Sequence, residues 1–219
     1  MSSGSFSGTV PLNYTALSQN GTSYSGTVYI TVSGSVSAYF DDVTQNYVWA
    51  ADAIDYLYKH SVVSGTDTDI FSPGSNIRRG DFVLMLVRAF SLTATDAKCS
   101  FTDVAKGSYY YDAIAISEKL GISQGSGGKF NPMATLTRQD AMVLVKRTLD
   151  VANIDIADGS ESDLRGFTDN SSISAYARDA AADLVKAGVI IGTDNKLNPS
   201  GSITRAELAV ILYRILSAF

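Results

Sequence analysis

The stretch that decides the fold is "GSITRAELAVILYRIL", residues 201–216, near the end of the chain. Its apolar residues recur every three or four positions, which is the period of an amphipathic helix. Thr204 and Glu207 have the spacing of an N-terminal capping box, so a helix is expected to begin there. Arg205 lies between them, although the positive end of a helix dipole repels a cation. This charge makes the stretch a candidate site as well as a determinant of the fold.

The same pattern occurs three times along the chain. An arginine follows a proline by the same interval in every copy: Pro73 to Arg79, Pro132 to Arg138 and Pro199 to Arg205. Each copy is preceded by another amphipathic segment, which opens with Phe-x-Asp, as in "FTDVAKGSYYYDAIAISEKLGISQG" at residues 101–125. Each repeat is therefore expected to form helix, loop, helix. Glycine is favoured at the left-handed C-cap of the first helices at Gly121 and Gly188, where the first repeat has Ser61.

Two short helices bury too little surface to be stable alone, so three repeats are expected to share one core. The expected fold is mainly α, a pseudo-threefold assembly of three helix-loop-helix repeats preceded by a short β segment. A closed arrangement is preferred to an open solenoid, because neither terminal repeat shows the polar outer face of a capping repeat. The repeats are assigned to residues 39–94, 99–151 and 165–219. Small residues at one aligned position, Ala53, Ala113 and Ala180, would let the three first helices approach closely.

Residues 1–38 have a different composition. Val28, Ile30 and Val32 alternate with Tyr29 and Thr31, which is the period of a strand, and "NG" at residues 20–21 is a turn signal. Two or three strands do not form a stable sheet alone. The segment is similar to the closing strands of the β-sandwich modules of bacterial surface proteins. It is interpreted as the tail of an upstream module, or as strands that lean on the helical part.

Composition excludes several classes of protein. The 219 residues carry a net charge of -5, which argues against a nucleic-acid partner. One cysteine and one histidine rule out a disulfide framework, Cys/His zinc sites and most histidine-dependent nucleophiles. No apolar run approaches the length of a membrane span, and "MSSGSFSGTV" lacks the features of a signal peptide. An exported form would therefore be part of a longer chain.

The ordered motifs F-x-D-V, W/Y-A-x-D-A-I, G, F-x-P and I-T-R-A-E resemble the S-layer homology domain, in three copies over residues 39–219. The resemblance implies non-covalent anchoring of a surface protein to secondary polymers of the bacterial cell wall. It also implies that a terminal pyruvate ketal on N-acetylmannosamine binds in grooves between repeats. The arginine of T-R-A-E is, by the same resemblance, the residue that contacts the anion.

The residues support an anion site on separate grounds. The first amides of a helix lack intrahelical partners, and together with a guanidinium they could hold an anion. A solvated Arg205, or one paired with Asp169 or Asp179, is the alternative. Recurrence of the arginine favours binding. The first repeat departs from the pattern, because Arg78 replaces the capping threonine and Gly80 weakens the helix start. The Arg79 groove is therefore expected to be altered or inactive.

The candidate ligand-binding residues recur at equivalent positions in all three repeats. The acids could accept hydrogen bonds from sugar hydroxyls, orient the arginines or cap the first helices. The aromatic residues could stack on a sugar or belong to the core. The glycines could form turns or let a sugar approach the backbone. The candidates are Arg79, Arg138, Arg205, Asp42, Asp103, Asp169, Trp49, Tyr109, Tyr176, Gly65, Gly125 and Gly192.

Other functions are weighed against the binding module. A structural, oligomerising helical module without a carbohydrate ligand is the main alternative. The loops "TDTD" and "TDNK" lack the regular oxygen ligands of a calcium loop, and a glycosidase would need a paired-carboxylate cleft. The R-G-D tripeptide at residues 79–81 aligns with T-R-Q-D and T-R-A-E, so it is interpreted as coincidence. We expect no catalytic residues, metal or cofactor.

Overall fold

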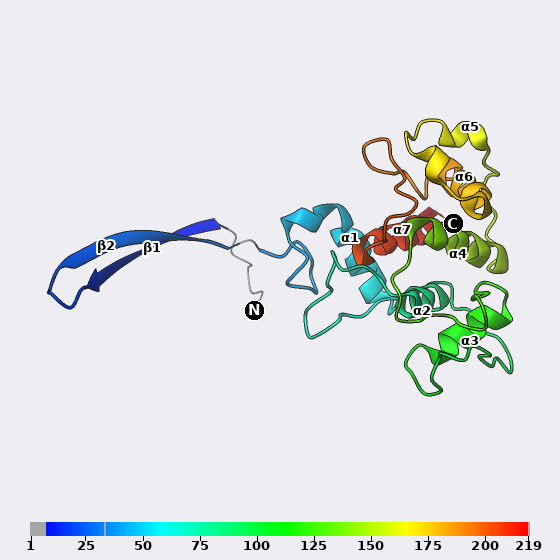
Figure 1. The fold of residues 1–219 in the computed structure, drawn as a ribbon, viewed down its shortest axis with the longest axis horizontal. Coiled ribbons are helices and arrows are strands. Elements are labelled where there is room, and N and C mark those ends of the chain that lie inside the picture. The colour runs from blue at the N-terminus through cyan, green and yellow to red at the C-terminus, as the bar shows by residue number, and fades with distance from the viewer. Residues whose placement is uncertain (1–7, 33, 219) are drawn as a thin grey trace.

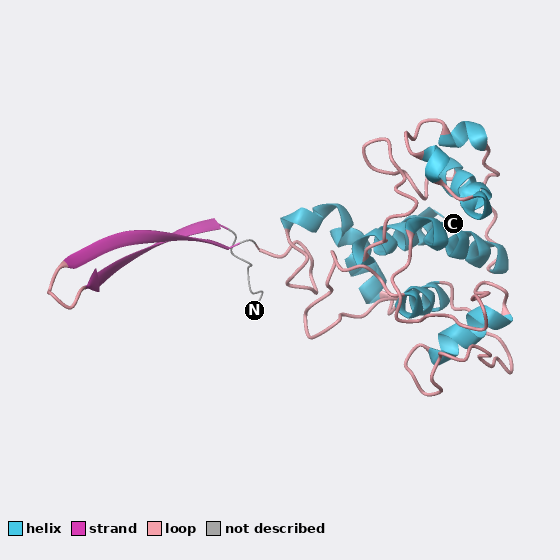
Figure 2. Cartoon of the chain, viewed as in Figure 1, coloured by secondary structure: helices cyan, strands magenta, loops and turns pink. Residues whose placement is uncertain are grey.

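The computed structural model describes residues 8–32 and 34–218 (Figure 1). The chain begins with the strands β1, Gly8–Leu17, and β2, Ser23–Val32, which pair in an antiparallel hairpin. The turn lies at the expected Asn20-Gly21 pair, and Gly21 has a φ of 84°, a conformation that glycine adopts without strain. The remaining described chain is helical apart from loops and isolated bridges (Figure 2). A mainly α fold with a short β segment is thus confirmed.

The hairpin extends away from the helices instead of leaning on them (Figure 1). Its register places Val10 opposite Ile30 and Leu12 opposite Val28, so these four side chains lie on one face of the ribbon. All four are exposed. The hairpin therefore presents an uncovered apolar face.

Each repeat forms two main helices, as the sequence predicts. A short additional helix lies in the linker before the third repeat, and single 3-10 turns precede some of the first helices. The main helices are α1 Val48–Lys59 and α2 Arg79–Ala89, α3 Tyr111–Lys119 and α4 Arg138–Val151, and α6 Arg178–Lys186 and α7 Arg205–Ala218. The short elements are α5 Glu161–Leu164, η1 Gln45–Tyr47, η2 Asn170–Ser172 and η3 Ala175–Ala177.

The first helix of each repeat packs mainly on the second helix of another repeat. Helix α3 packs on α2, α6 packs on α4, and α1 packs on α7. The last of these pairs joins the first repeat to the third, so the repeats close on themselves and do not form an open row. The first helices do not make their main contacts with one another, and the expected close approach at Ala53, Ala113 and Ala180 is wrong. The second helices separate them.

A ring of backbone hydrogen bonds joins the loops before the second helices. The amide of Ile77 donates to the carbonyl of Ile203 at 3.0 Å, Ile203 donates to Leu136 at 3.1 Å, and Leu136 donates to Ile77 at 3.3 Å. All three side chains are buried. Each repeat thus contributes one donor and one acceptor to the centre of the helical part, which fixes the relative positions of the second helices.

The expected helix ends and core stripes are confirmed. Gly121, Gly188 and Ser61 have φ values of 76°, 70° and 60°, so all three are left-handed C-caps. The apolar stripes are fully buried at their centres, as at Leu57 and Leu212. Burial of this kind stabilises each large aliphatic side chain by about 1.5–3 kcal/mol.

Candidate functional site

The three recurring arginines all point from a helix start to a loop of another repeat. Arg79 Nε donates to the carbonyl of Phe130 at 3.0 Å, Arg138 Nε to that of Leu197 at 2.8 Å, and Arg205 Nε to that of Phe71 at 2.8 Å. The acceptors are equivalent residues, each two positions before the recurring proline. Neither Asp169 nor Asp179 pairs with Arg205, so the alternative of an ion pair with either acid is wrong. The carbonyl oxygens offset the repulsion between the arginines and the helix dipoles.

The amides at these helix starts are not free to hold an anion. In α7 the amides of Arg205 and Ala206 donate to the carbonyls of Ser75 and Pro73, both at 3.0 Å. The first two amides of α2 and of α4 donate to loop carbonyls in the same way. The expectation that the first amides of each helix bind the anion together with the guanidinium is therefore wrong for the first two amides. The guanidinium groups remain the candidates for holding an anion in the grooves.

The capping residues behave as expected in two repeats. Thr204 Oγ1 accepts the amide of Glu207 at 3.2 Å, and Glu207 Oε2 accepts the amide of Thr204 at 2.8 Å, which completes a capping box. Thr137 Oγ1 accepts the amide of Asp140 at 3.2 Å. Arg78 at the equivalent position of α2 makes no side-chain cap hydrogen bond. The first repeat therefore lacks one cap, as the sequence predicts.

The third residue of each second helix is an acid that also faces a groove. Tyr109 donates its hydroxyl to Asp81 at 2.5 Å, and Tyr176 donates to Asp140 at 2.6 Å. Desolvation and the neighbouring carboxylate raise the pKa of each of these tyrosines to about 12. The sequence did not predict these hydrogen bonds between the acids and the tyrosines.

The groove at Arg138 differs, because the aromatic residue there is Trp49. Its indole has no hydroxyl group, and its Nε1 donates to the carbonyl of Asn46 at 3.1 Å. Trp49 therefore does not donate to Glu207 as the tyrosines donate to Asp81 and Asp140. Glu207 instead accepts from Arg138 Nη1 at 2.6 Å, with side-chain exposures of 33% and 12%. In this groove the arginine charge is already paired within the protein.

The recurring aspartates hold the loops that bear the arginine-binding carbonyls. Asp42 accepts the amides of Phe71 and Ser72 at 2.8 and 2.7 Å. Asp103 binds the amides of Phe130 and Asn131, and Asp169 those of Leu197 and Asn198, in the same two-oxygen arrangement. Burial alone would raise the pKa of Asp103, but the two amide hydrogen bonds lower it. The acceptor geometry assigns these acids to loop positioning, and not to caps of the first helices.

The recurring glycines lie where the chain passes closely over these loops. Gly125 and Gly192 have φ values of 59° and 67°, in the left-handed region. A Cβ on Gly65 would lie 2.6 Å from two backbone oxygens, those of Asp67 and Ile70. The turn interpretation therefore accounts for all three glycines.

The aromatic residues at the first helices are exposed and do not belong to the core. Trp49, Tyr109 and Tyr176 are 53%, 64% and 60% exposed, respectively. Their rings are therefore available to an extended ligand, and the core interpretation is wrong.

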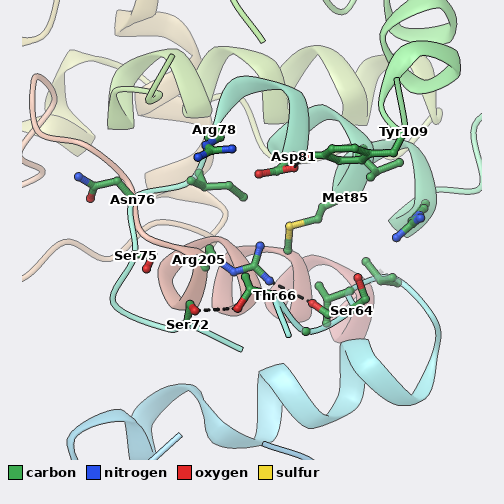
Figure 3. Close-up of a pocket in the computed structure, with 16 residues that line it drawn as sticks. Ser64, Thr66, Ser72, Ser75, Asn76, Arg78, Asp81, Met85, Tyr109 and Arg205 are labelled. Atoms are coloured by element: carbon green, nitrogen blue, oxygen red, sulfur yellow. Dashed lines mark hydrogen bonds between the residues drawn. The ribbon is translucent and has the colours of Figure 1, made fainter. Parts of the chain in front are cut away.

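The Arg205 groove is a cavity of about 690 Å³. Figure 3 shows Arg78, Asp81 and Tyr109 on the α2 side of the cavity and Arg205 on the α7 side. Arg205 Nη2 also donates to the carbonyl of Ser64 at 3.1 Å, which leaves Nη1 available. The cavity thus contains residues from all three repeats, and its size is typical of small-molecule sites.

The Arg138 groove is a cavity of about 500 Å³ built from equivalent elements. Arg138, Gly192, Trp49 and Glu207 line it, as Arg205, Gly65, Tyr109 and Asp81 line the first. The structure thus brings together the candidate arginine, glycine and aromatic residue from three different repeats. Around Arg79, the electrostatic neighbours Asp140 and Tyr176 are the corresponding residues.

The Arg79 groove keeps the same arginine geometry despite its different sequence. Helix α2 begins at Arg79, as α4 and α7 begin at their arginines. A Cβ on Gly80 would lie 3.1 Å from Tyr110 and 3.2 Å from the carbonyl of Pro132, so glycine there permits close packing. The R-G-D tripeptide forms the first turn of this helix, and its Asp81 accepts a hydrogen bond from Tyr109. This placement is consistent with the interpretation that the tripeptide is a chance match to the short motif.

The sequence predictions did not include a second set of recurring arginines. Arg88 lines the Arg205 cavity and Arg214 lines the Arg138 cavity, at equivalent positions near the ends of α2 and α7. Arg147 and Arg214 donate from Nη1 to the carbonyls of Ile122 and Val189. These arginines could have been found from the sequence, because "LVRAF", "VKRTL" and "LYRIL" share an arginine at the same position of each repeat.

Two further findings concern the part of the chain that the structure describes. Its Asp, Glu, His and Cys side chains form no group of three or more that could hold a metal ion. Among its helices, none combines the length and apolar character needed to cross a membrane.

Fold and grooves together define a helical repeat module with arginine-lined cavities between its repeats. Residues 39–83, 100–142 and 166–209 match the S-layer homology domain, and the chain belongs to this family. The S-layer homology domain is a non-catalytic anchoring module. Membership places the chain at the bacterial cell surface, in association with the cell wall.

The same region of the chain matches surface-layer proteins and enzymes. It is 30% identical over 185 residues to the surface-layer 125 kDa protein of Lysinibacillus sphaericus, covering 82% of this chain and 15% of that protein. It is 29% identical over 171 residues to the S-layer protein sap of Bacillus anthracis, covering 78% and 20%. An amylopullulanase of Thermoanaerobacterium thermosulfurigenes is 30% identical over 180 residues, covering 81% and 9%. The chain thus spans a small part of the relatives it matches.

Proposed function

We propose that this chain anchors a longer surface protein to the cell wall by binding pyruvylated secondary cell wall polysaccharide in the grooves between its repeats. The observation that carries the proposal is the Arg205 cavity, which concentrates guanidinium groups in a chain with a net charge of -5. A pyruvate ketal presents a carboxylate, which forms charge-assisted hydrogen bonds to arginine. Tyr109 beside it offers an exposed ring for the sugar.

The candidate residues divide into two roles in this proposal. The available guanidinium nitrogens of Arg79, Arg138 and Arg205 face the carboxylate, and Trp49, Tyr109 and Tyr176 contact the sugar. The recurring aspartates and glycines act as positioning residues, because they hold the loops against which the arginines are fixed. No catalytic step is required of any of them.

The proposed assembly is pseudo-threefold, with one groove for each pair of neighbouring repeats. Two observations support it: the cyclic pairing of α1 with α7, α3 with α2 and α6 with α4, and the backbone ring of Ile77, Leu136 and Ile203. Each groove then takes equivalent residues in the same order.

Co-sedimentation with Gram-positive wall sacculi tests the function. The chain is expected to sediment with intact sacculi and to remain in solution after hydrofluoric acid has removed the polymer. The double variant Arg138→Ala and Arg205→Ala is expected to lose binding while circular dichroism reports retained helices. Binding that survives removal of the polymer would contradict the proposal. A concentration-dependent increase in mass, without polymer binding, would favour the oligomerising module.

The hairpin is proposed to be the tail of an upstream β module in the longer protein. Its uncovered apolar face, with Val10, Leu12, Val28 and Ile30, supports this role. Removal of residues 1–34 is expected to leave the thermal unfolding midpoint of the helical part unchanged. A fall of several degrees would show that the hairpin stabilises the helices instead.

A further inference from the structure

Position 78 distinguishes the Arg205 groove from its counterparts. Arg78 occupies the place of the capping residues Thr137 and Thr204 in the other repeats, and it lines the Arg205 cavity. It makes no cap hydrogen bond at the start of α2. The arginine therefore replaces a residue type that stabilises helix starts, and its side chain forms no hydrogen bond or ion pair with the residues that the structure describes.

The charged side chains that line the two cavities sum to different net charges. The Arg205 cavity has three arginines, Arg78, Arg88 and Arg205, and one acid, Asp81, which is bound to Tyr109. The Arg138 cavity has two arginines, Arg138 and Arg214, and one acid, Glu207, which is bound to Arg138. The formal charge of the lining is thus +2 in the first cavity and +1 in the second. One carboxylate would balance the second cavity but not the first.

Two of the three arginines in the Arg205 cavity have no side-chain partner among the residues that the structure describes. In the described ranges 8–32 and 34–218, the side chains of Arg78 and Arg88 form no hydrogen bond and no ion pair. Arg205, in contrast, uses Nε and Nη2 on backbone carbonyls and retains one nitrogen for a ligand. A single carboxylate on Arg205 would leave the donor forks of Arg78 and Arg88 unused.

We propose that the Arg205 groove of this chain binds a saccharide segment with two acidic groups, one at Arg205 and a second at Arg78 on the facing wall. This inference rests on the proposed function, because it assigns the ligand of the same groove. Figure 3 shows Arg78 and Arg205 on opposite sides of the cavity, so the two acids are expected on different parts of the glycan. The volume of about 690 Å³ is larger than that of the Arg138 cavity, at about 500 Å³.

The shared chemistry of the second group is a negative charge with oxygen acceptors, which a uronic acid or a phosphate supplies. Both accept paired hydrogen bonds from a guanidinium. Arg78 is exposed, so its interaction with the acid is expected to weaken as salt is added. The positive charge of Arg78 already acts on the groove, because it lowers the pKa of Tyr109 and so partly offsets the increase caused by desolvation and Asp81.

Calorimetric titration of the whole chain with three defined saccharides tests the proposal. The first is a pyruvylated N-acetylmannosamine glycoside with one carboxylate. The second and third carry an additional uronic acid or an additional phosphate on the neighbouring position. The wild-type chain is expected to bind either two-acid saccharide about tenfold or more tightly than the one-acid saccharide. Arg78→Thr, which restores the residue of the other repeats, is expected to make the affinities converge.

Arg165→Thr is the matched control, because it removes the same charge from an exposed position outside the lining of both cavities. It is expected to keep the preference. Equal affinity of the wild type for all three saccharides, or a preference that survives Arg78→Thr, would overturn the proposal and leave the anchoring function intact. Binding of none of them would instead contradict the proposed function. Thermal unfolding of Arg78→Thr confirms that the variant is folded.

Discussion

Arg205 Nε donates to the carbonyl of Phe71, a residue 134 positions earlier in the chain, and its guanidinium lies 4.6 Å from the centre of the Phe71 ring. This contact joins the last helix to the first repeat. It gives the arginine a structural role in addition to the proposed ligand role, because one part of the guanidinium is fixed and another faces the groove. Preorganisation of this kind reduces the entropy lost on binding.

Replacement of Arg205 is therefore expected to affect stability as well as binding. Arg205→Ala removes two hydrogen bonds to carbonyls and a cation–π contact, and we expect a loss of about 2–3 kcal/mol of unfolding free energy. Urea denaturation measures the loss. Arg88→Ala is the control, with an expected change below about 0.5 kcal/mol, because Arg88 has no partner within the described part of the chain. Equal effects of the two changes would contradict the structural role of Arg205.

Glu207 is expected to restrain ligand binding in the Arg138 groove. Glu207→Gln removes the charge that pairs with Arg138 at 2.6 Å, while the amide oxygen can still accept from the helix start. We expect a loss of about 1 kcal/mol in stability and tighter binding of a saccharide with a single carboxylate. Calorimetric affinity and stoichiometry measure the gain. Glu161→Gln, which breaks the Arg178 pair outside the grooves, is expected to bring no gain; similar affinity in both variants would refute the restraint.

Asp103 is expected to contribute an acid-sensitive part of the stability. Its amide hydrogen bonds favour the carboxylate in the folded state, so the pKa of Asp103 is lower than in the unfolded chain. The contribution is present above the unfolded pKa of about 3.9 and disappears as the pH falls through the folded value. Asp103→Asn is expected to cost about 1 kcal/mol at neutral pH and less at about pH 2.

Unfolding free energies of wild type and variant across that range measure the difference. Asp155→Asn is the control, since Asp155 is exposed and makes no hydrogen bond within the described residues. A difference for Asp103→Asn that does not change with pH would rule out the linkage.

Tyr109 is expected to ionise late in an alkaline titration. Desolvation and Asp81 raise its pKa to about 12, so the stability linked to its hydroxyl is present below the unfolded value of about 10 and is lost between about 10 and 12. The tyrosinate absorbance of Asp81→Asn is expected to show one tyrosine ionising earlier than in the wild type. Asp140→Asn is expected to do the same through Tyr176. Adding Tyr109→Phe to Asp81→Asn should abolish the earlier ionisation; if it persists, another tyrosine is responsible.

Local features of the repeats could be predicted from the sequence. The capping box of Thr204 and Glu207, the left-handed cap at Gly121 and the buried stripe with Leu57 and Leu212 all depend on neighbours within a few residues. The role of Asp42 was less accessible. Its partners lie about 30 positions away in the loop at Phe71 and Ser72, and no local pattern specifies that contact.

The sequence by itself determined that the chain has three copies of a helix-loop-helix unit, each with an arginine at the start of its second helix. Periodicity and capping suffice for this, because a helix is defined by interactions within one or two turns. Only the tertiary structure decided that these helix starts are closed by carbonyls of another repeat and that each groove takes residues from three repeats. It also showed that Arg138 pairs with Glu207, whereas Arg78 has no ion-pair partner in the described part of the chain. Those differences arise from contacts between residues far apart in the chain, and charge balance in a groove depends on which side chains the fold brings together.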